Sequence, residues 1–388
     1  MDDSVRPCGL LMVAGEPSGD RHGADLARAL KEKLPGVRLW GMGGDHMRET
    51  GVDLLVDISR VSVVGIMEVA SRLGAVLRAR RELLRAVDRV RPAMAILIDF
   101  PDFNLWLARG LKRRGIPILY YIAPQAWAWR RGRVKLMARL LDRLAVILPF
   151  EEEFFRAGGV STKFVGHPLL EQLQVRESSE EAKEALGLGP EVRVLGLLPG
   201  SRLNEVQRML PLMLEASARL ARQVEDLCPV VAVSPAVDPD RVDSLVAAHC
   251  PMARTVVGQA HRVLRASQVA AVASGTATLE AALLGTPTVV VYRASWVSYL
   301  LARVLVRVKH VSLVNILAGR EVVPELIQRH FTARSLELEL LNLLEDPQRR
   351  QGMQDEMGQL AGRLGRPGAS MAVAEMALEM LDHRAVGG

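Results

Sequence analysis

An apolar run over residues 94–98 ends at Asp99, which is followed by Phe100 and Pro101. In α/β enzymes the carboxyl ends of the strands present side chains to a ligand. A carboxylate in this position can accept a proton from an attacking hydroxyl group. Asp102 has the ordinary alternative of capping the helix that begins beside it. Asp99 is therefore a candidate general base, and a structural role in the turn is the competing interpretation.

A loop that contains glycine follows the first apolar run, residues 10–14. Gly15, Glu16, Ser18 and Gly19 stand between this run and a stretch with helical spacing. Glycine allows the backbone to approach a ligand closely, and a helix N-terminus attracts anions. These features predict a substrate loop in which Glu16 contacts a sugar hydroxyl group. A tight turn without a ligand explains the glycines equally well, because the pattern is not GxGxxG.

Two loops of similar composition follow the apolar runs 192–198 and 269–273. Small hydroxyl residues and glycine at a helix start can donate hydrogen bonds to a pyrophosphate, and Arg202 adds positive charge. Glu280, one turn into its helix, can accept both hydroxyl groups of a ribose. Together the loops predict a nucleoside diphosphate site, although a turn explains either of them alone. The candidate residues are Gly200, Ser201, Arg202, Ser274, Gly275, Thr276 and Glu280.

Residues 121–133 place Trp127 and Trp129 beside three arginines, directly after an apolar run. Stacking on a base or sugar, together with phosphate contact, would use this set. An RNA-binding loop and a packed interface are the alternatives. Because nothing else in the chain resembles an RNA-binding module, we expect no nucleic acid partner.

No metal site and no cofactor are expected. Asp238 and Asp240 match the DxD spelling of metal-dependent glycosyltransferases, but they flank a proline where a helix is expected to begin. Helix capping is therefore the favoured interpretation. The eight histidines show no spacing that would hold a metal ion, and we assign none of them a ligand role.

Residues 62–92 have helical spacing with apolar side chains around more of the surface than one core stripe requires, and arginines are interspersed. This pattern is typical of a helix on a membrane surface. A buried helix whose arginines extend to solvent is the alternative. The candidate membrane-facing or acyl-facing residues are Ile66, Met67, Val69, Leu73 and Leu77.

The elements that must position these residues are short apolar runs alternating with amphipathic stretches, and the alternation occurs twice. It predicts parallel βαβ units and an α/β fold of two Rossmann-like, doubly wound lobes with a cleft between them. We expect an N-terminal lobe over residues 1–170 and a nucleotide-sugar-binding lobe over residues 171–345. Residues 346–388 are expected to form C-terminal helices that pack across the lobes.

The composition is that of a folded protein, because 49% of the 388 residues are hydrophobic and 24% are charged. The net charge of +6 favours an anionic partner, although solubility alone also explains it. Three cysteines without a CxxC pair argue against a disulfide framework. No signal peptide or membrane-spanning run is recognised, so we expect a cytoplasmic protein.

Six strings occur in an order and spacing that resemble the lipid-A-disaccharide synthase family of glycosyltransferases, which is of the GT-B type (family 19). The resemblance covers nearly the whole chain. Because the motifs are long and mutually ordered, it is far more specific than one glycine loop. The strings are GEPSGD, IDFPDFN, APQAWAWR, LPGSR, ASGTATLEAALLGTP and HVSLVNILAGRE.

The resemblance implies an inverting reaction that joins UDP-2,3-diacylglucosamine to 2,3-diacylglucosamine 1-phosphate. The products are UDP and the β-1′,6-linked disaccharide of lipid A, a precursor of lipopolysaccharide. By the same match Asp99 takes the base position and Arg202 the donor-phosphate position. Glu280 takes the ribose position, and Asn315 lies in the last string at a donor-site position.

A partner membrane is implied by the acylated donor and acceptor, with the protein peripheral on the inner face of the bacterial inner membrane. The sequence leaves open whether the chain forms a homodimer. Two other classes of function also stay open at this point. A UDP-sugar epimerase would need no acceptor, and a nucleotide-sugar binding protein would show no turnover.

Overall fold

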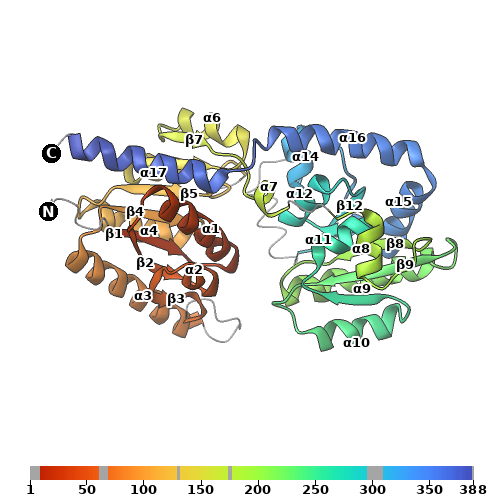
Figure 1. The fold of residues 1–388 in the computed structure, drawn as a ribbon. Helices are drawn as coiled ribbons and strands as arrows, with labels where there is room; N and C mark the ends of the chain where they lie inside the picture. The colour runs from red at the N-terminus through yellow and green to blue at the C-terminus, as the bar shows by residue number, and fades with distance from the viewer. Residues whose placement is uncertain (1–8, 61–68, 129–131, 174–176, 295–308, 387–388) are drawn as a thin grey trace. The chain divides into compact units, whose positions relative to one another are not determined.

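The computed structural model describes residues 9–60, 69–128, 132–173, 177–294 and 309–386 (Figure 1). The chain divides into two compact units. Unit 1 comprises Met1–Glu171 and Leu364–Gly388, and unit 2 comprises Gln172–Arg363. Each unit is built around one parallel β-sheet with helices packed against it.

Unit 1 contains a sheet of seven strands in the order β3-β2-β1-β4-β5-β6-β7, and every neighbouring pair is parallel. The strands are β1 Gly9–Ala14, β2 Arg38–Gly43, β3 Asp53–Asp57, β4 Met94–Ile98, β5 Ile118–Tyr121, β6 Arg143–Val146 and β7 Thr162–Phe164. The helices are α1 Pro17–Lys33, α2 Asp45–Glu49, α3 Val69–Val90, α4 Pro101–Lys112, α5 Gly132–Leu140, α6 Pro149–Ala157, α7 Leu169–Gln172 and α17 Ala369–Val386, with a 3₁₀ turn at Ile58–Arg60.

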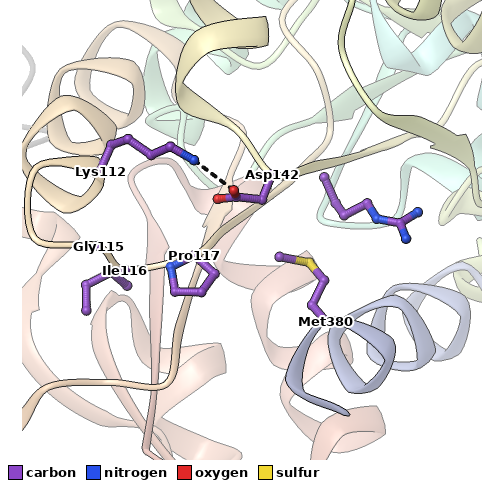
Figure 2. Close-up of a pocket in the computed structure, with 7 residues that line it drawn as sticks. Lys112, Gly115, Ile116, Pro117, Asp142 and Met380 are labelled. Carbon is purple, nitrogen blue, oxygen red and sulfur yellow. Dashed lines mark hydrogen bonds and ion pairs between the residues drawn. The ribbon is translucent and has the colours of Figure 1, made fainter. Parts of the chain in front are cut away.

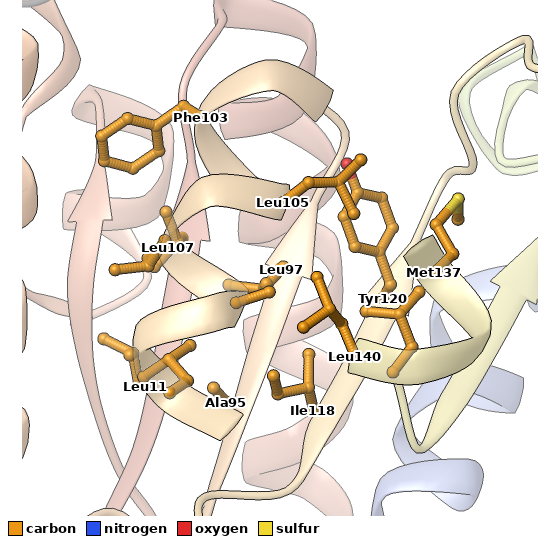
Figure 3. Close-up of a cluster of buried hydrophobic side chains, with 14 of the residues drawn as sticks. Leu11, Ala95, Leu97, Phe103, Leu105, Leu107, Ile118, Tyr120, Met137 and Leu140 are labelled. Carbon is orange, nitrogen blue, oxygen red and sulfur yellow. The ribbon is translucent and has the colours of Figure 1, made fainter. Parts of the chain in front are cut away.

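Both faces of this sheet are buried, which is why its central strands are continuously apolar. Successive side chains point to opposite faces, so Leu11 lies in one cluster with residues of α3, α4 and α5. Figure 3 shows part of that cluster, with Leu97 and Tyr120 between the helices. Leu10 lies in a second cluster on the other face, with α1 and α17.

Helix α3 is a core helix over its second half. Leu83 is fully buried and Leu84 nearly so, and both pack in the cluster of Figure 3. Both leucines belong to the apolar pattern of residues 62–92, for which a membrane-surface helix and a buried helix were the two interpretations. For these two side chains the buried-helix interpretation holds, because they fill the space between α3 and the sheet.

Unit 2 contains a sheet of six strands in the order β10-β9-β8-β11-β12-β13, again all parallel. The strands are β8 Arg193–Leu198, β9 Leu227–Val233, β10 Arg254–Val257, β11 Ser267–Ala273, β12 Thr288–Tyr292 and β13 Glu325–Ile327. The helices are α8 Ser179–Ala185, α9 Leu203–Leu220, α10 Pro239–His249, α11 Ala260–Ala266, α12 Thr276–Leu283, α14 Leu313–Ala318, α15 Ala333–Glu345 and α16 Pro347–Arg363, with a 3₁₀ turn at Gln328–His330.

The two sheets have the same strand order over their first six strands, counted from the start of each unit. This is the Rossmann order, and it confirms the predicted α/β class with two doubly wound sheets. The order reverses between β1 and β4 in unit 1 and between β8 and β11 in unit 2. Ligands of such sheets bind outside the carboxyl ends of the strands at these reversals.

The C-terminal segment is shared between the units. Whereas residues 346–388 were grouped together from the sequence, α16 belongs to unit 2 and α17 to unit 1. Within unit 1, α17 packs on α1. Its start is held by Glu171, whose Oε1 accepts the backbone N–H groups of Gly368 and Ser370 at 3.0 and 3.2 Å.

Candidate active site

Asp99 lies immediately after β4 in a backbone conformation that few residues adopt. Asp99 and Phe100 both have φ near 46°, in the left-handed region. The conformation is held by three hydrogen bonds to the Asp99 backbone. Its N–H donates to Tyr121 O at 2.9 Å, and its carbonyl accepts from Tyr120 Oη at 2.5 Å and from Asn104 Nδ2 at 2.7 Å. Strain retained in this way is characteristic of functional sites.

The Asp99 carboxyl group is largely buried. Burial raises its pKa from 3.8 to about 6, and the charge of Glu16 adds to this increase. Glu16 is near because β1 and β4 pair with Ala14 opposite Ile98. Gly15 allows the close approach, since a Cβ atom there would lie 2.0 Å from the Phe100 ring. The structure thus brings the predicted substrate loop and the candidate base together.

The side chains of the substrate loop divide into exposed and structural ones. Ser18 is exposed and Glu16 half-buried, whereas Gly19 is buried. Asp20 is only 3% exposed, and its carboxylate accepts the backbone N–H of Gly44 at 2.6 Å and that of Met47 at 3.1 Å. Asp20 therefore fixes the start of α2 and leaves Glu16 and Ser18 as the groups that can meet a ligand.

Trp127 has a packing role in the aromatic and basic loop after β5. Its ring is 8% exposed, meets Phe150 edge to face, and donates its indole N–H to Glu151 Oε1 at 3.0 Å. This corrects the expectation that Trp127 stacks on a base or sugar. Trp129 lies outside the described residues. Arg133 forms an ion pair with the exposed Asp102, next to the candidate base.

Glu151 is a residue that the sequence analysis missed. Burial raises its pKa from 4.5 to about 7, although the Trp127 hydrogen bond opposes that increase. A Glu three residues into a helix signals a capping box, and the side chain also accepts the Leu148 N–H. Its partnership with Trp127 has no signal in the sequence, because Trp127 lies in the loop after β5 and Glu151 lies in α6.

The first donor loop of unit 2 follows β8. Gly200 has a φ of 110°, which only glycine readily adopts, and Arg202 stands at the N-cap of α9. The Arg202 side chain is 74% exposed and only 3.4 Å from Glu205 Oε1. Ser201 is also exposed. A solvated cation at a helix N-terminus is well suited to meet a phosphate.

The second donor loop follows β11, and β8 and β11 are neighbours in the sheet. Gly275 is the N-cap of α12, and Thr276 begins the helix. Ser274 Oγ donates to Val311 O at 3.0 Å, which ties this loop to the segment before α14. Unit 2 thus places both predicted donor loops at its own strand reversal.

Asn315 is completely buried, and all of its amide hydrogen-bonding capacity is used internally. Its Nδ2 donates to Val323 O at 2.8 Å and Glu325 Oε1 at 2.9 Å, while Oδ1 accepts the N–H groups of Val322 and Val323. The side chain therefore has no capacity left to bind the donor, which corrects that expectation. Glu325, missed in the sequence, also accepts the Ser312 N–H at 2.9 Å.

Glu280 lies in α12, with its side chain 18% exposed. His261 of α11 places Nε2 at 3.3 Å from Glu280 Oε2. No sequence pattern connects the two residues, because His261 lies in α11 and Glu280 lies in α12. A histidine therefore adjoins the carboxylate predicted to bind ribose.

Neither a metal site nor a membrane span is found among the described residues. No group of three His, Cys, Asp or Glu side chains in that part of the chain is arranged to hold a metal ion. Asp238 caps α10 by accepting the Asp240 N–H at 3.2 Å, so the capping interpretation is confirmed. No helix in the described ranges is long and apolar enough to cross a bilayer.

The structure describes the side chain of only one of the five candidate membrane-facing residues. Ile66 and Met67 lie outside the described residues, and the side chains of α3 are described from residue 74 onward, which leaves out Val69 and Leu73. Leu77 is half-buried.

The hollow in Figure 2 belongs to unit 1 and lies away from the loops that carry Glu16 and Asp99. It has a volume of about 350 Å³ and includes Pro117, Arg143 and Met380 in its lining. Lys112 Nζ donates to Asp142 Oδ1 at 2.7 Å across it. Because Pro117 and Arg143 lie at the amino ends of β5 and β6, the hollow is at the sheet edge opposite Asp99.

Two Rossmann-type parallel sheets in one chain are the arrangement of GT-B enzymes, and the candidate base and the two candidate donor loops lie at the strand reversals of these sheets. The family model for lipid-A-disaccharide synthetase matches residues 10–379. The chain belongs to the lipid-A-disaccharide synthase family, and it is a glycosyltransferase of lipid A biosynthesis.

The relatives agree over almost the full length. A lipid-A-disaccharide synthase from Syntrophus aciditrophicus (strain SB) is 46% identical over 376 residues, which cover 96% of this chain and 97% of that protein. One from Myxococcus xanthus (strain DK1622) is 44% identical, with 97% and 98% covered.

Solved structures with the same fold include UDP-GlcNAc 2-epimerase from Neisseria meningitidis bound to UDP-GlcNAc. It has a TM-score of 0.65 and 12% identity, with 96% of this chain and 100% of that chain covered. The glycotransferase of kitacinnamycin has a TM-score of 0.63 and 16% identity, with 97% and 100% covered. At these identities the likeness concerns the fold alone.

Proposed function

We propose that this chain joins UDP-2,3-diacylglucosamine to 2,3-diacylglucosamine 1-phosphate, giving the β-1′,6-linked disaccharide 1-phosphate and UDP. The observation that carries the assignment of roles is the largely buried Asp99 carboxyl group, held at the strand reversal of unit 1. Family membership supports the choice of substrates, and it favours transfer over epimerisation or simple binding.

Asp99 acts as the general base in this proposal. It takes the proton of the acceptor 6-hydroxyl while that oxygen attacks the anomeric carbon of the donor, and the bond from this carbon to the UDP oxygen breaks. Attack from the face opposite the leaving group inverts the anomeric centre. A pKa of about 6 suits a base that works near neutral pH, because it is ionised there yet retains proton affinity.

Unit 2 supplies the donor site in this proposal. Arg202, with the N–H groups at the start of α9 and α12, stabilises the negative charge that develops on the departing UDP. Ser201, Ser274 and Thr276 line the same loops with hydroxyl groups. Glu280 accepts the ribose hydroxyls. Asn315 holds the backbone of Val322 and Val323 by hydrogen bonds.

Mass spectrometry of the products tests the proposal. The purified protein should convert the diacyl UDP-sugar and the diacyl sugar phosphate into a disaccharide phosphate and an equal amount of UDP. An epimerase would instead invert one carbon of the sugar without the acceptor, which leaves the mass of the UDP-sugar unchanged and gives no disaccharide. A binding protein would leave both compounds intact, and either result would contradict the proposal.

We also propose that the protein works as a peripheral protein on the inner face of the inner membrane, since both substrates carry acyl chains. Helix α3 supports this, because Arg78, Arg81 and Arg85 are exposed on it and Leu77 is half-buried. Each arginine near anionic lipid contributes ~1 kcal/mol, and each buried CH₂ group ~0.8 kcal/mol.

Replacing Ile66, Met67, Val69, Leu73 and Leu77 together by Ser should release the protein from anionic vesicles in a flotation assay. Salt alone should release it only partly, because screening acts on the arginines and not on apolar contact. Leu338→Ser in unit 2, where Leu338 is 42% exposed, is the control and should not change flotation. A folded five-residue variant that still floats would place the membrane face elsewhere.

A further inference from the structure

His261, which lies beside Glu280, has no role in the mechanism above. The 3.3 Å distance joins His261 Nε2 to Glu280 Oε2. The histidine is 34% exposed and the carboxylate 18%, so the pair is open to solvent on one side.

Helix α11 presents His261 from a fixed position. Arg265 Nη1 donates to the carbonyl of Leu284, which follows α12, at 3.3 Å. Thr286 Oγ1 donates to Leu264 O at 2.9 Å, so the segment after α12 is also tied to α11. His261 and Glu280 are thus held by two helices whose ends are joined by hydrogen bonds.

Unit 2 contains a second contact between a histidine and a glutamate, at a place where no ligand is proposed. His249 Nδ1 of α10 lies 3.5 Å from Glu215 Oε1 of α9, and the two side chains are 31% and 41% exposed. Partly exposed pairs of this type contribute little to stability. The contact with Glu280 is therefore expected to add little to the stability of the fold. A role for His261 in orienting the carboxylate of Glu280 explains its position better.

We propose that His261 is a positioning residue for the nucleotide. From 3.3 Å its Nε2–H can donate to Oε2 of Glu280 and restrict rotation of the carboxylate, so that the two oxygens face the two neighbouring hydroxyls of the UDP ribose. This inference rests on the proposed donor site in unit 2, and it adds a residue that determines how well ribose is distinguished from deoxyribose.

Calorimetric titration of the full-length protein with UDP and with 2′-deoxy-UDP tests this inference. His261→Ala should bind UDP about 3- to 10-fold more weakly, the range for losing one hydrogen bond, and 2′-deoxy-UDP almost as before. His261→Gln places an amide N–H near the position of Nε2 and should keep most of the preference for UDP. His261→Asn is too short and should behave like Ala.

His249→Ala is the matched control, because it removes the comparable pair and should leave both affinities unchanged. Equal weakening of both nucleotides in His261→Ala and His261→Gln would show a structural role and overturn the inference. If Glu280→Gln weakens UDP binding but His261→Ala does not, the inference fails while the donor site stands. If Glu280→Gln also leaves UDP binding unchanged, the donor-site assignment itself is wrong.

Discussion

Replacing Asp99 by Asn should stop the reaction and stabilise the fold at the same time. Asn is close in size, tolerates the left-handed φ of 46°, and carries no charge. The Asp99 pKa lies at about 6 instead of 3.8. At about 1.4 kcal/mol per pKa unit, ionising this carboxyl group costs the folded state up to ~3 kcal/mol. That cost is absent in the variant.

The direction of the pH dependence follows from linkage. The raised pKa means that folded wild-type protein binds more protons than unfolded protein between pH 4 and 6, so its stability falls as the pH rises through that window. The variant should therefore match wild type near pH 4 and exceed it above pH 6. For a unit of this size, up to ~3 kcal/mol corresponds to roughly 6–12 °C in melting temperature.

Thermal unfolding at pH 4.5 and pH 8, together with turnover by product mass, is the assay. Turnover should fall ~10²- to 10⁴-fold, the scale for losing a positioned base. Asp102→Asn is the control, because the Asp102 side chain is 80% exposed and should alter neither quantity much. Equal melting temperatures of Asp99→Asn and wild type at pH 8, or turnover within a few-fold, would refute the reasoning.

Three further outcomes are expected. Arg202→Ala should lower kcat/KM ~10²- to 10³-fold through loss of a charged phosphate contact, whereas the exposed Arg208→Ala on the same helix should not; equal kinetics would relocate the phosphate site. EDTA should leave activity intact, because Asp238 caps a helix, and a loss restored by a divalent ion would overturn that reading. Glu151→Gln should raise the melting temperature at pH 8 but not at pH 4, because the raised Glu151 pKa of about 7 makes its ionised form costly in the folded state. A pH-independent difference would contradict the burial argument.

The central strands were predictable because burial on both faces leaves a continuous apolar run. The apolar run 94–98 agrees with β4 to the residue, and the run 10–14 differs from β1 only by one residue at its start. The strands missed from the sequence are β3, β7 and β13, whose sequences are DLLVD, TKF and ELI. They are short edge strands that carry charged residues, which is how edges avoid pairing with other chains.

The loops of the site were predictable for a related reason, since a polar residue directly after a buried strand is visible in sequence. Asp99 and Arg202 were selected as candidates in this way. The residues that contact these loops and helices could not be predicted from the sequence. Glu151 reaches Trp127 and His261 reaches Glu280 only after distant loops and helices meet, and no periodicity encodes such a meeting.

The two units use one strand order but treat charge in opposite ways. Unit 1 largely buries the Asp99 carboxyl group, and loss of hydration with the like charge of Glu16 nearby raises its pKa to about 6, in the range that the proposed base requires. Unit 2 leaves Arg202 exposed, which agrees with the proposed phosphate contact, because burying an isolated cation would be costly. The strand reversal is the same in both units, so the two candidate residues differ in how deeply their loops cover them. Consistent with this, the αL backbone that carries Asp99 is held by three hydrogen bonds, whereas the Arg202 side chain has one weak contact of 3.4 Å with Glu205.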